Sequence, residues 1–192
     1  MIGNIKPCIY AVLLCVFTVT SATCFANDDE FFLEIFKPRD AETEVTRQEN
    51  LYADFVLVRK SERKLYLYSG NQEIKSYNIA LGKQPEGHKQ TEGDSRTPEG
   101  TYTLDWRNPN SKFFRSIHVS YPTVQQSRNA REAGVNPGGA IMIHGQPNSW
   151  AERIHLTFAD QDWTEGCIAV ENQDMLEIWD LVKDGTPITI EP

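Results

Sequence analysis

Short segments in which apolar and polar residues alternate run through the chain from residue 55 onward, and they constrain the fold more than any other feature. Such alternation is typical of β-strands that bury one face. The predicted strands are Phe55–Arg59, Leu65–Tyr68, Ile74–Ala80, Thr101–Trp106, Ile117–Ser120 and Ala140–Ile143. Ser69, Gly70 and Asn71 supply the first hairpin turn. The strands do not alternate with helical segments, so the pattern argues against a doubly wound parallel sheet.

One helix is predicted near the C-terminal end of the chain. Asn172 can serve as its N-cap, and Gly185 ends it. Pro187–Ile190 follows as a closing strand. Four apolar residues at helical spacing form the face that packs on the sheet: Met175, Ile178, Trp179 and Val182. The sequence therefore predicts a mainly β domain with one packed C-terminal helix.

Residues 1–26 have the pattern of an export signal. Lys6 precedes an apolar run, and small residues follow that run. The run has roughly 12 residues, whereas a membrane-spanning helix needs about 20. We expect cleavage after Ala26, with cleavage after Ala22 as an alternative. A core helix, a retained anchor, and a lipoprotein that begins at Cys24 are the other interpretations.

The signal is followed by an acidic leader, residues 27–53, and then by the predicted domain, residues 54–192. Phe31–Phe36 is largely apolar, and we expect it to dock on the domain as a short helix or to bind a partner. The length of 192 residues leaves room for one domain with a sizeable core. We expect an exported protein whose mature chain has no transmembrane segment.

The charge balance excludes two classes of partner. The chain has 19 Lys and Arg against 27 Asp and Glu, a net charge of −8. So acidic a chain lacks the basic surface that nucleic acid requires, and anionic lipid surfaces would repel it. With 40% hydrophobic and 10% aromatic residues, it is too apolar for a disordered tail.

Removal of the signal would leave Cys167 as the lone cysteine. A lone thiol in an oxidising compartment is a liability unless it is buried or chemically used. Gly166 permits a tight turn in which consecutive N–H groups converge beside the sulfur, as an acyl-transfer nucleophile requires. His144 is the best candidate base, because it ends a strand and precedes Gly145. From spacing alone, an inert buried cysteine and a structural histidine both remain open. The other histidines, which are His88, His118 and His155, compare poorly with His144 as candidate bases.

Several motifs, in order, resemble the L,D-transpeptidase catalytic domain, the YkuD-like family. They are Ile141-Met142-Ile143-His144-Gly145 and Thr164-Glu165-Gly166-Cys167, supported by the stretches 64–68, 93–100 and 137–139. The resemblance implies a β-sandwich with a packed helix. It also implies that a cysteine attacks a peptidoglycan stem peptide at the L-centre of diaminopimelate and forms a thioester. Under this resemblance, Cys167 is the nucleophile and His144 the proton acceptor and donor. The backbone N–H groups of Gly166 and Cys167 are the oxyanion donors.

Two positions depart from the family's pattern. Family members usually have His before the Gly-Cys pair and Arg or Asn shortly after it, where this chain has Glu165 and Ala169. A carboxylate that faces the sulfur disfavours the thiolate. We therefore expect Glu165 to point into solvent, and the alternatives are a cation or hydroxyl partner or contact with a substrate ammonium. A subgroup related to murein hydrolases that release lipoprotein from diaminopimelate also has both departures, which keeps a water-resolved reaction open.

Four residues are candidates for substrate binding: Glu165, Arg96, Trp163 and Tyr121. Arg96 lies in a long glycine-rich loop over residues 82–100, and loops of this length usually carry function. We expect Arg96 to hold that loop through charged hydrogen bonds, or to face a substrate carboxylate. The aromatic candidates and Asn148 either line the groove or belong to the core and its surroundings.

The leading function is an exported peptidoglycan L,D-transpeptidase that passes the thioester to an amine. The second is a hydrolase at the same bond, which trims a stem as an L,D-carboxypeptidase or frees a wall-linked lipoprotein. The third is an inactive wall-binding module, and intact Cys167 and His144 argue against it. A papain-like protease is disfavoured because the chain lacks a Gln-x-Cys-Gly segment and has His before Cys. The expected location is the periplasm or cell wall, and no metal or organic cofactor is expected.

Overall fold

The computed structural model describes residues 52–157 and 162–192, which belong to one compact unit. The strands are β1 (Phe55–Arg59), β2 (Lys64–Ser69), β3 (Gln72–Asn78), β4 (Gly100–Ser111), β5 (Phe114–Val119), β6 (Met142–His144), β7 (Ile168–Ala169) and β8 (Thr186–Glu191). The helices are α3 (Val124–Glu132), α4 (Trp150–Thr157) and α5 (Asn172–Leu181). The predicted export signal and the predicted short helix over residues 31–36 lie outside the described residues.

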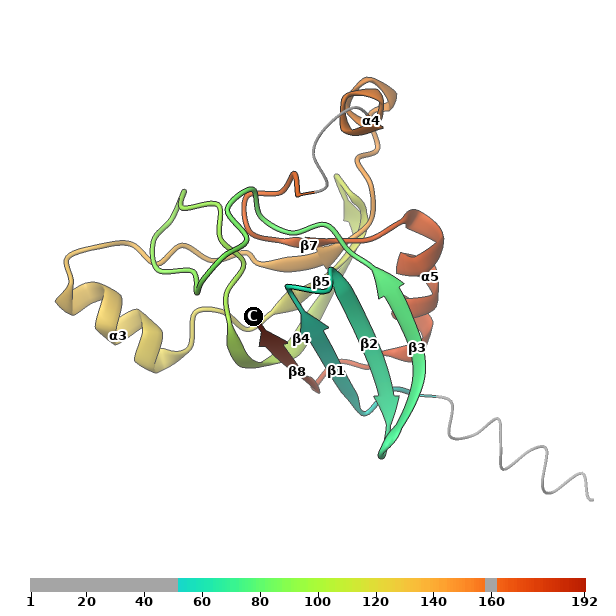
Figure 1. The fold of residues 1–192 in the computed structure, drawn as a ribbon, viewed down its shortest axis with the longest axis horizontal. Coiled ribbons are helices and arrows are strands. Elements are labelled where there is room, and N and C mark those ends of the chain that lie inside the picture. The colour runs from blue at the N-terminus through green and yellow to red at the C-terminus, as the bar shows by residue number, and fades with distance from the viewer. Residues whose placement is uncertain (1–51, 158–161) are drawn as a thin grey trace, which may run out of the picture. The chain divides into compact units, whose positions relative to one another are not determined.

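The eight strands form one sheet in the order β3-β2-β1-β8-β4-β5-β6-β7, which curls over on itself (Figure 1). The β1–β8 and β6–β7 pairs are parallel, and the other pairs are antiparallel. Ala80 and Ala169 exchange two backbone hydrogen bonds of 2.8 Å, which join the chain after β3 to β7. Because β3 and β7 are the two ends of the strand order, this contact closes one corner of the curled sheet.

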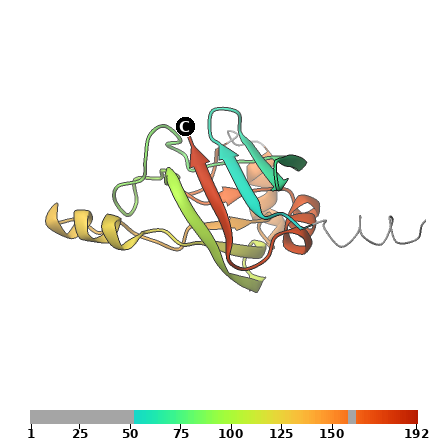
Figure 2. The same ribbon diagram turned by 90° about the horizontal axis from the view of Figure 1, so that it is seen from below.

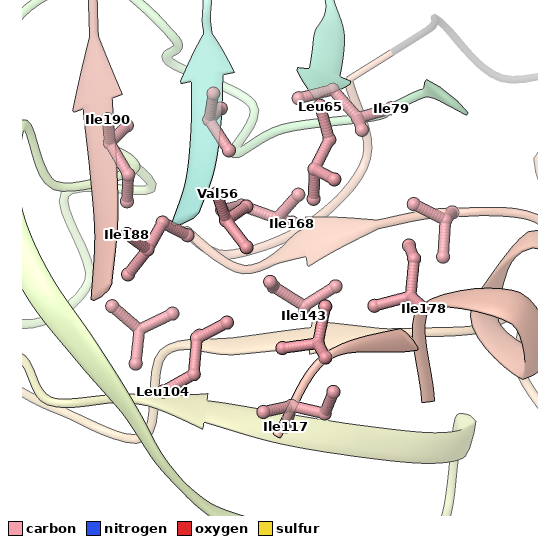
Figure 3. Close-up of a cluster of buried hydrophobic side chains, with 14 of the residues drawn as sticks. Val56, Leu65, Ile79, Leu104, Ile117, Ile143, Ile168, Ile178, Ile188 and Ile190 are labelled. Carbon is pink, nitrogen blue, oxygen red and sulfur yellow. The ribbon is translucent and has the colours of Figure 1, made fainter. Parts of the chain in front are cut away.

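The core lies between the two halves of the curled sheet, and its side chains are mostly Ile, Leu and Val. Figure 3 shows Val56, Leu65 and Ile188 facing Leu104 and Ile143 across this space. All of these side chains are fully buried. β-Branched residues suit such strands because they pack well on a pleated, buried surface.

Helix α5 packs against the same core and confirms the predicted C-terminal helix. Met175, Ile178 and Val182 are fully buried, and Trp179 is partly buried. The helix begins one residue earlier than predicted, because Glu171 occupies the N-cap position. The side chain of Asn172 instead accepts a hydrogen bond of 2.7 Å from the backbone N–H of Gln146.

The predicted mainly β fold is confirmed, with two helices beyond the one expected. Helix α3 projects from the sheet on the side away from α5 (Figure 1, Figure 2). It begins with a capping box between Thr123 and Gln126, and only Ala130 of its residues is buried. The sequence of α3 therefore has no apolar stripe from which the helix could be predicted. In the described ranges, no helix is both long and apolar enough to cross a membrane.

Candidate active site

A tight turn over residues 164–167 places Cys167 directly before β7. Gly166 has φ +126°, and a Cβ there would lie 2.6 Å from the backbone oxygen of Arg96, so only glycine fits. The hydroxyl of Thr164 accepts from the Gly166 N–H at 3.1 Å and donates to the Cys167 carbonyl at 2.8 Å. These bonds hold the backbone on both sides of the thiol.

The pairing of β6 with β7 brings His144 and Cys167 to the same face of the sheet. Ile143 pairs with Ile168 and His144 pairs with Ala169. Ile143 and Ile168 are fully buried in the core. Because side chains alternate along a strand, His144 and Cys167 point to the opposite, outer face. The structure thus places on adjacent strands the two residues that the motifs singled out.

The thiol of Cys167 is partly exposed and neutral in this arrangement. Its Sγ lies 3.6 Å from the carbonyl oxygen of Ala140, and within the described ranges no hydrogen bond to His144 accompanies that contact. Burial raises the pKa of the thiol, while the backbone N–H of Met142 and the charge of Lys89 act in the opposite direction. The resting site therefore holds a protonated thiol.

His144 is buried and arranged as a proton acceptor. Its Nδ1 lies 2.7 Å from the carbonyl oxygen of Gly145, so the proton belongs on Nδ1 and the lone pair on Nε2. Burial lowers the pKa of the imidazole, and the bond to Gly145 partly offsets this. The ring packs against Phe113 and Trp163, with centroid distances of 4.6 and 5.6 Å.

Asn148 holds the hairpin that presents Phe113 to His144. Its Oδ1 accepts from the Phe114 N–H at 3.0 Å, and its Nδ2 donates to the Ser111 carbonyl at 2.9 Å. Asn148, expected to line the groove or to be structural, thus fastens the tip of the β4–β5 hairpin.

The two N–H groups predicted as oxyanion donors, those of Gly166 and Cys167, are not equally available. The Gly166 N–H already donates to the hydroxyl of Thr164. The Cys167 N–H has no acceptor among the residues that the structure describes. Cys167 N–H is therefore the one of the two that is open to a substrate oxygen.

Glu165 lies on the surface in the 164–167 turn. Its side chain is 65% exposed, pairs with Lys83, and accepts a hydrogen bond from the hydroxyl of Ser95. The hydrogen bonds from Lys83 and then Ser95 lower the pKa of Glu165. Glu165 is thus exposed and also held by a cation and a hydroxyl, two arrangements that the sequence left as alternatives.

Two buried lysines hold the 82–100 loop, and Arg96 does not. Lys89 Nζ lies 2.7 Å from Asp94, and Lys60 Nζ lies 2.6 Å from Glu99. The guanidinium of Arg96 makes no hydrogen bond within the described ranges, and it lies beside Gly87. The predicted loop-holding role of Arg96 therefore belongs to the lysines.

The two aromatic candidates, Trp163 and Tyr121, lie in different places. Trp163 packs on His144, whereas Tyr121 lies in the wall of a different pocket of about 360 Å³ between the loop and α3. The Tyr121 hydroxyl donates to the Pro137 carbonyl at 3.1 Å. The lining of that pocket includes neither Cys167 nor His144.

Sequence reasoning missed Lys89 and Phe113. Lys89 lies among polar loop residues with no periodic pattern to mark it. The doublet Phe113-Phe114 was the only sign of an aromatic contact at the hairpin tip. In the described part of the chain, no three His, Cys, Asp or Glu side chains are grouped to hold a metal ion.

The sequence matches the L,D-transpeptidase catalytic domain family, YkuD, over residues 53–190. The chain belongs to this family. This confirms the resemblance drawn from the motifs around His144 and Cys167, and the relatives below place the chain in a YafK-like subgroup.

Three relatives show how far the similarity extends. YafK of Escherichia coli K12, named as a candidate L,D-transpeptidase, is 30% identical over 135 residues, 67% of this chain. The helical cell shape determining protein Pgp2 of Campylobacter jejuni is 27% identical over 71% of this chain, with a TM-score of 0.56. Bd1075 of Bdellovibrio bacteriovorus is 28% identical over 71%, with a TM-score of 0.51. The chain spans about half the length of these relatives, 46% of each.

Proposed function

We propose that this protein is a peptidoglycan L,D-transpeptidase in which Cys167 forms a thioester with the stem peptide. The bond attacked is the one after the L-centre of diaminopimelate. The observation that carries the proposal is the shared outer face of β6 and β7. There the partly exposed thiol lies next to a histidine whose Nε2 has no hydrogen-bond partner among the described residues. Membership of the L,D-transpeptidase family supports the substrate class.

The proposed first half-reaction follows from the proton positions. Substrate binding turns Sγ from the Ala140 carbonyl toward His144, and Nε2 accepts the thiol proton as sulfur bonds to the carbonyl carbon. The Cys167 N–H donates to the developing oxyanion. The imidazolium then gives its proton to the leaving amine as the C–N bond breaks, which leaves the thioester.

In the second half-reaction, an amine attacks the thioester. His144 removes the proton of that amine, and the proton returns to sulfur when the C–S bond breaks. Water in place of the amine would give a hydrolase with the same residues, which would trim stems or free a wall-linked lipoprotein. The chain has Glu165 and Ala169 where the family usually has His and Arg or Asn. These two departures support the hydrolase as the second candidate function.

Arg96 is proposed to bind a carboxylate of the stem peptide. Its guanidinium is unpaired within the described ranges, and its backbone oxygen lies against Gly166, next to the nucleophile. Guanidinium groups bind carboxylates in a two-pronged geometry. Glu165 and Trp163 flank the same turn and stay proposed contacts, whereas Tyr121 has the weakest support because its hydroxyl is bonded within the other pocket.

The test is mass spectrometry of digested sacculi after incubation with the mature protein and a D-amino acid acceptor. Exchange at the fourth position, or new diaminopimelate cross-links, that depend on Cys167 would establish the transpeptidase. Cys167→Ala is the matched control because it removes only the sulfur. Shortened stems or a released linked protein without exchange would reassign the protein as the hydrolase. No change with either protein would favour the inactive wall-binding module.

We further propose that residues 1–26 export the protein to the periplasm or cell wall. The basic residue, short apolar run and small residues of that segment support this. The mass of the protein purified from its host would show a start at residue 27, or at residue 23 for the alternative cleavage. An intact Met1 in the mature protein would contradict export by this signal.

A further inference from the structure

The outer face that holds the thiol continues across the sheet to β5. In the β5–β6 pair, His118 lies opposite Met142, whose backbone N–H acts on the sulfur of Cys167. The neighbouring pair, Ile117 and Ile143, points into the core. His118 therefore faces the same side as Cys167. It is two strands away, roughly 10 Å at the usual strand spacing.

On this face Asp105, Trp106 and His118 form what we call the outer cluster. The β4–β5 register shifts between Leu104 and Arg107, so two β4 residues lie against His118. The Trp106 indole stacks on the His118 ring with centroids 4.9 Å apart and planes 18° apart. Asp105 Oδ1 lies 2.7 Å from His118 Nδ1.

The outer cluster is open to solvent and contains one carboxylate, that of Asp105. Trp106 is 45% exposed, and the Asp105 side chain is 42% exposed. The arginines of the same hairpin are engaged elsewhere, since Arg107 pairs with Asp184 and Arg115 lies over Trp179. Among the described residues, no lysine or arginine pairs with Asp105.

These features fit a cation. An indole face attracts an ammonium group through its quadrupole, and an adjacent carboxylate supplies the opposite charge. The imidazole holds both groups in place, because it stacks on one and donates to the other. A purely structural role would not require the indole and the carboxylate to remain open to solvent.

We propose that the outer cluster binds the ammonium group at the far end of diaminopimelate while the L-centre carbonyl lies at Cys167. This inference rests on the proposed function and names the part of the substrate that β4 and β5 recognise. In this arrangement the extended diaminopimelate side chain runs from the thiol past Met142 toward the carboxylate of Asp105. The proposed path of that side chain is thus the outer face of the sheet from Cys167, past Met142, to the outer cluster.

The test measures binding rather than turnover, in a Cys167→Ala background. Two synthetic stem tetrapeptides are titrated by calorimetry, identical except that one has its diaminopimelate amine acetylated. We expect the free amine to bind about tenfold more tightly, and Asp105→Asn to remove most of that preference without changing the affinity for the acetylated peptide. Trp106→Gln should act in the same direction.

Glu73→Gln is the matched control, since it removes an exposed carboxylate from β3. It should leave both affinities unchanged, and circular dichroism would verify that each variant is folded. Equal affinity of the parent for the two peptides, or an equal loss for both in Asp105→Asn, would overturn the inference while leaving the proposed function intact. Failure of the parent to bind either peptide would overturn the proposed function and this inference together.

Discussion

At the scale of single residues, the site is built around a thiol and an imidazole that are both neutral at rest. Burial acts on the two in opposite directions, since it raises the pKa of Cys167 and lowers that of His144. Both shifts favour the uncharged form. In the proposed reaction, the thiolate would therefore be generated by proton transfer when substrate binds, rather than being present beforehand as a thiolate–imidazolium pair.

Alkylation of Cys167 by iodoacetamide should report this state directly. We expect slow labelling at pH 7 and an inflection above the ordinary thiol value of 9.0, because the anion is disfavoured until the pH exceeds the raised pKa. The measurement is the labelling rate against pH, by intact mass, on a chain lacking residues 1–26. Cys167 is the only cysteine of that chain, so Cys167→Ser gives the background. An inflection below pH 7 would show a preformed thiolate.

Gly166 offers a second prediction at this scale. Gly166→Ala should lower the melting temperature and abolish labelling by a thiol-acylating carbapenem, because the new Cβ would meet the backbone oxygen of Arg96. Gly134→Ala is the matched control, since Gly134 also has a positive φ but nothing within 4 Å of the added Cβ. It should cost only the backbone strain, about 1–2 kcal/mol. Equal destabilisation by both changes would contradict the steric argument.

How much could be predicted at this scale depends on the sequence separation of the contacts. His144 and Cys167 were identified because local motifs surround them. The partners of Glu165 were not, because Lys83 and Ser95 lie in a loop 82 and 70 residues away. The role of Lys60 was missed for the same reason, since Glu99 is 39 residues away. Lys89 pairs with Asp94 only five residues away, and its role was missed because nothing in the sequence marks a lysine as buried.

At the scale of elements, the alternating pattern located the strands but not their ends. β1 matches its predicted range, whereas β4 extends five residues beyond the predicted Trp106 to Ser111. Apart from Pro109 those added residues are polar, and they belong to the hairpin with β5, so pairing and not composition makes them a strand. β7 has only two residues and no alternation to detect.

The 82–100 loop provides a prediction about pH at the element scale. Burial raises the pKa of Asp94, but hydrogen bonds from Lys89 and from three backbone N–H groups outweigh burial and lower this pKa to about 2. Because this lies below the ordinary value of 3.8, the stabilisation is present above pH 4 and is lost as the pH falls toward 2. Asp94→Asn should therefore reduce the free energy of unfolding at pH 6 but make little difference at pH 2.

Urea unfolding at the two pH values measures this. Glu86→Gln, an exposed carboxylate in the same loop, is the matched control and should have no effect at either pH. An effect of Asp94→Asn that stays the same at both values would mean that packing, rather than the charge of Asp94, holds the loop.

At the scale of the whole molecule, the curl of the sheet brings distant segments to the 164–167 turn. The chain after β3 pairs with both ends of the 164–169 segment, at Ala169 and at Thr164. Alternation indicates strands but does not show which strands become neighbours across some 80 residues. The pairing of the chain after β3 with the 164–169 segment therefore could not be predicted from the sequence. The family resemblance predicted the β-sandwich, whereas the Ala80–Ala169 contact beside Cys167 was found only in the structure.

The ion pair between Arg63 and Asp162 tests whether that closure matters for activity. Arg63 lies in the turn between β1 and β2, and its Nε and Nη2 reach Asp162 at 3.0 and 2.8 Å. Asp162 also accepts from the Leu81 N–H at 2.9 Å, so it joins three segments just before Trp163. Asp162→Ala should cost about 2 kcal/mol or more of stability, because it removes the acceptor of Nε and Nη2 of a partly buried guanidinium, which among the described residues keeps only its bond to the Lys60 carbonyl, and of the Leu81 N–H.

The same change should slow acylation of Cys167 well beyond the loss expected from unfolding, because Trp163 and the 164–167 turn lose their anchor. The measurement is carbapenem acylation at a temperature where circular dichroism shows the variant fully folded. Glu62→Gln, which breaks the exposed pair with Arg59, is the matched control and should change neither stability nor acylation appreciably. Normal acylation in folded Asp162→Ala would show that the 164–167 turn keeps its geometry without this corner of the sheet.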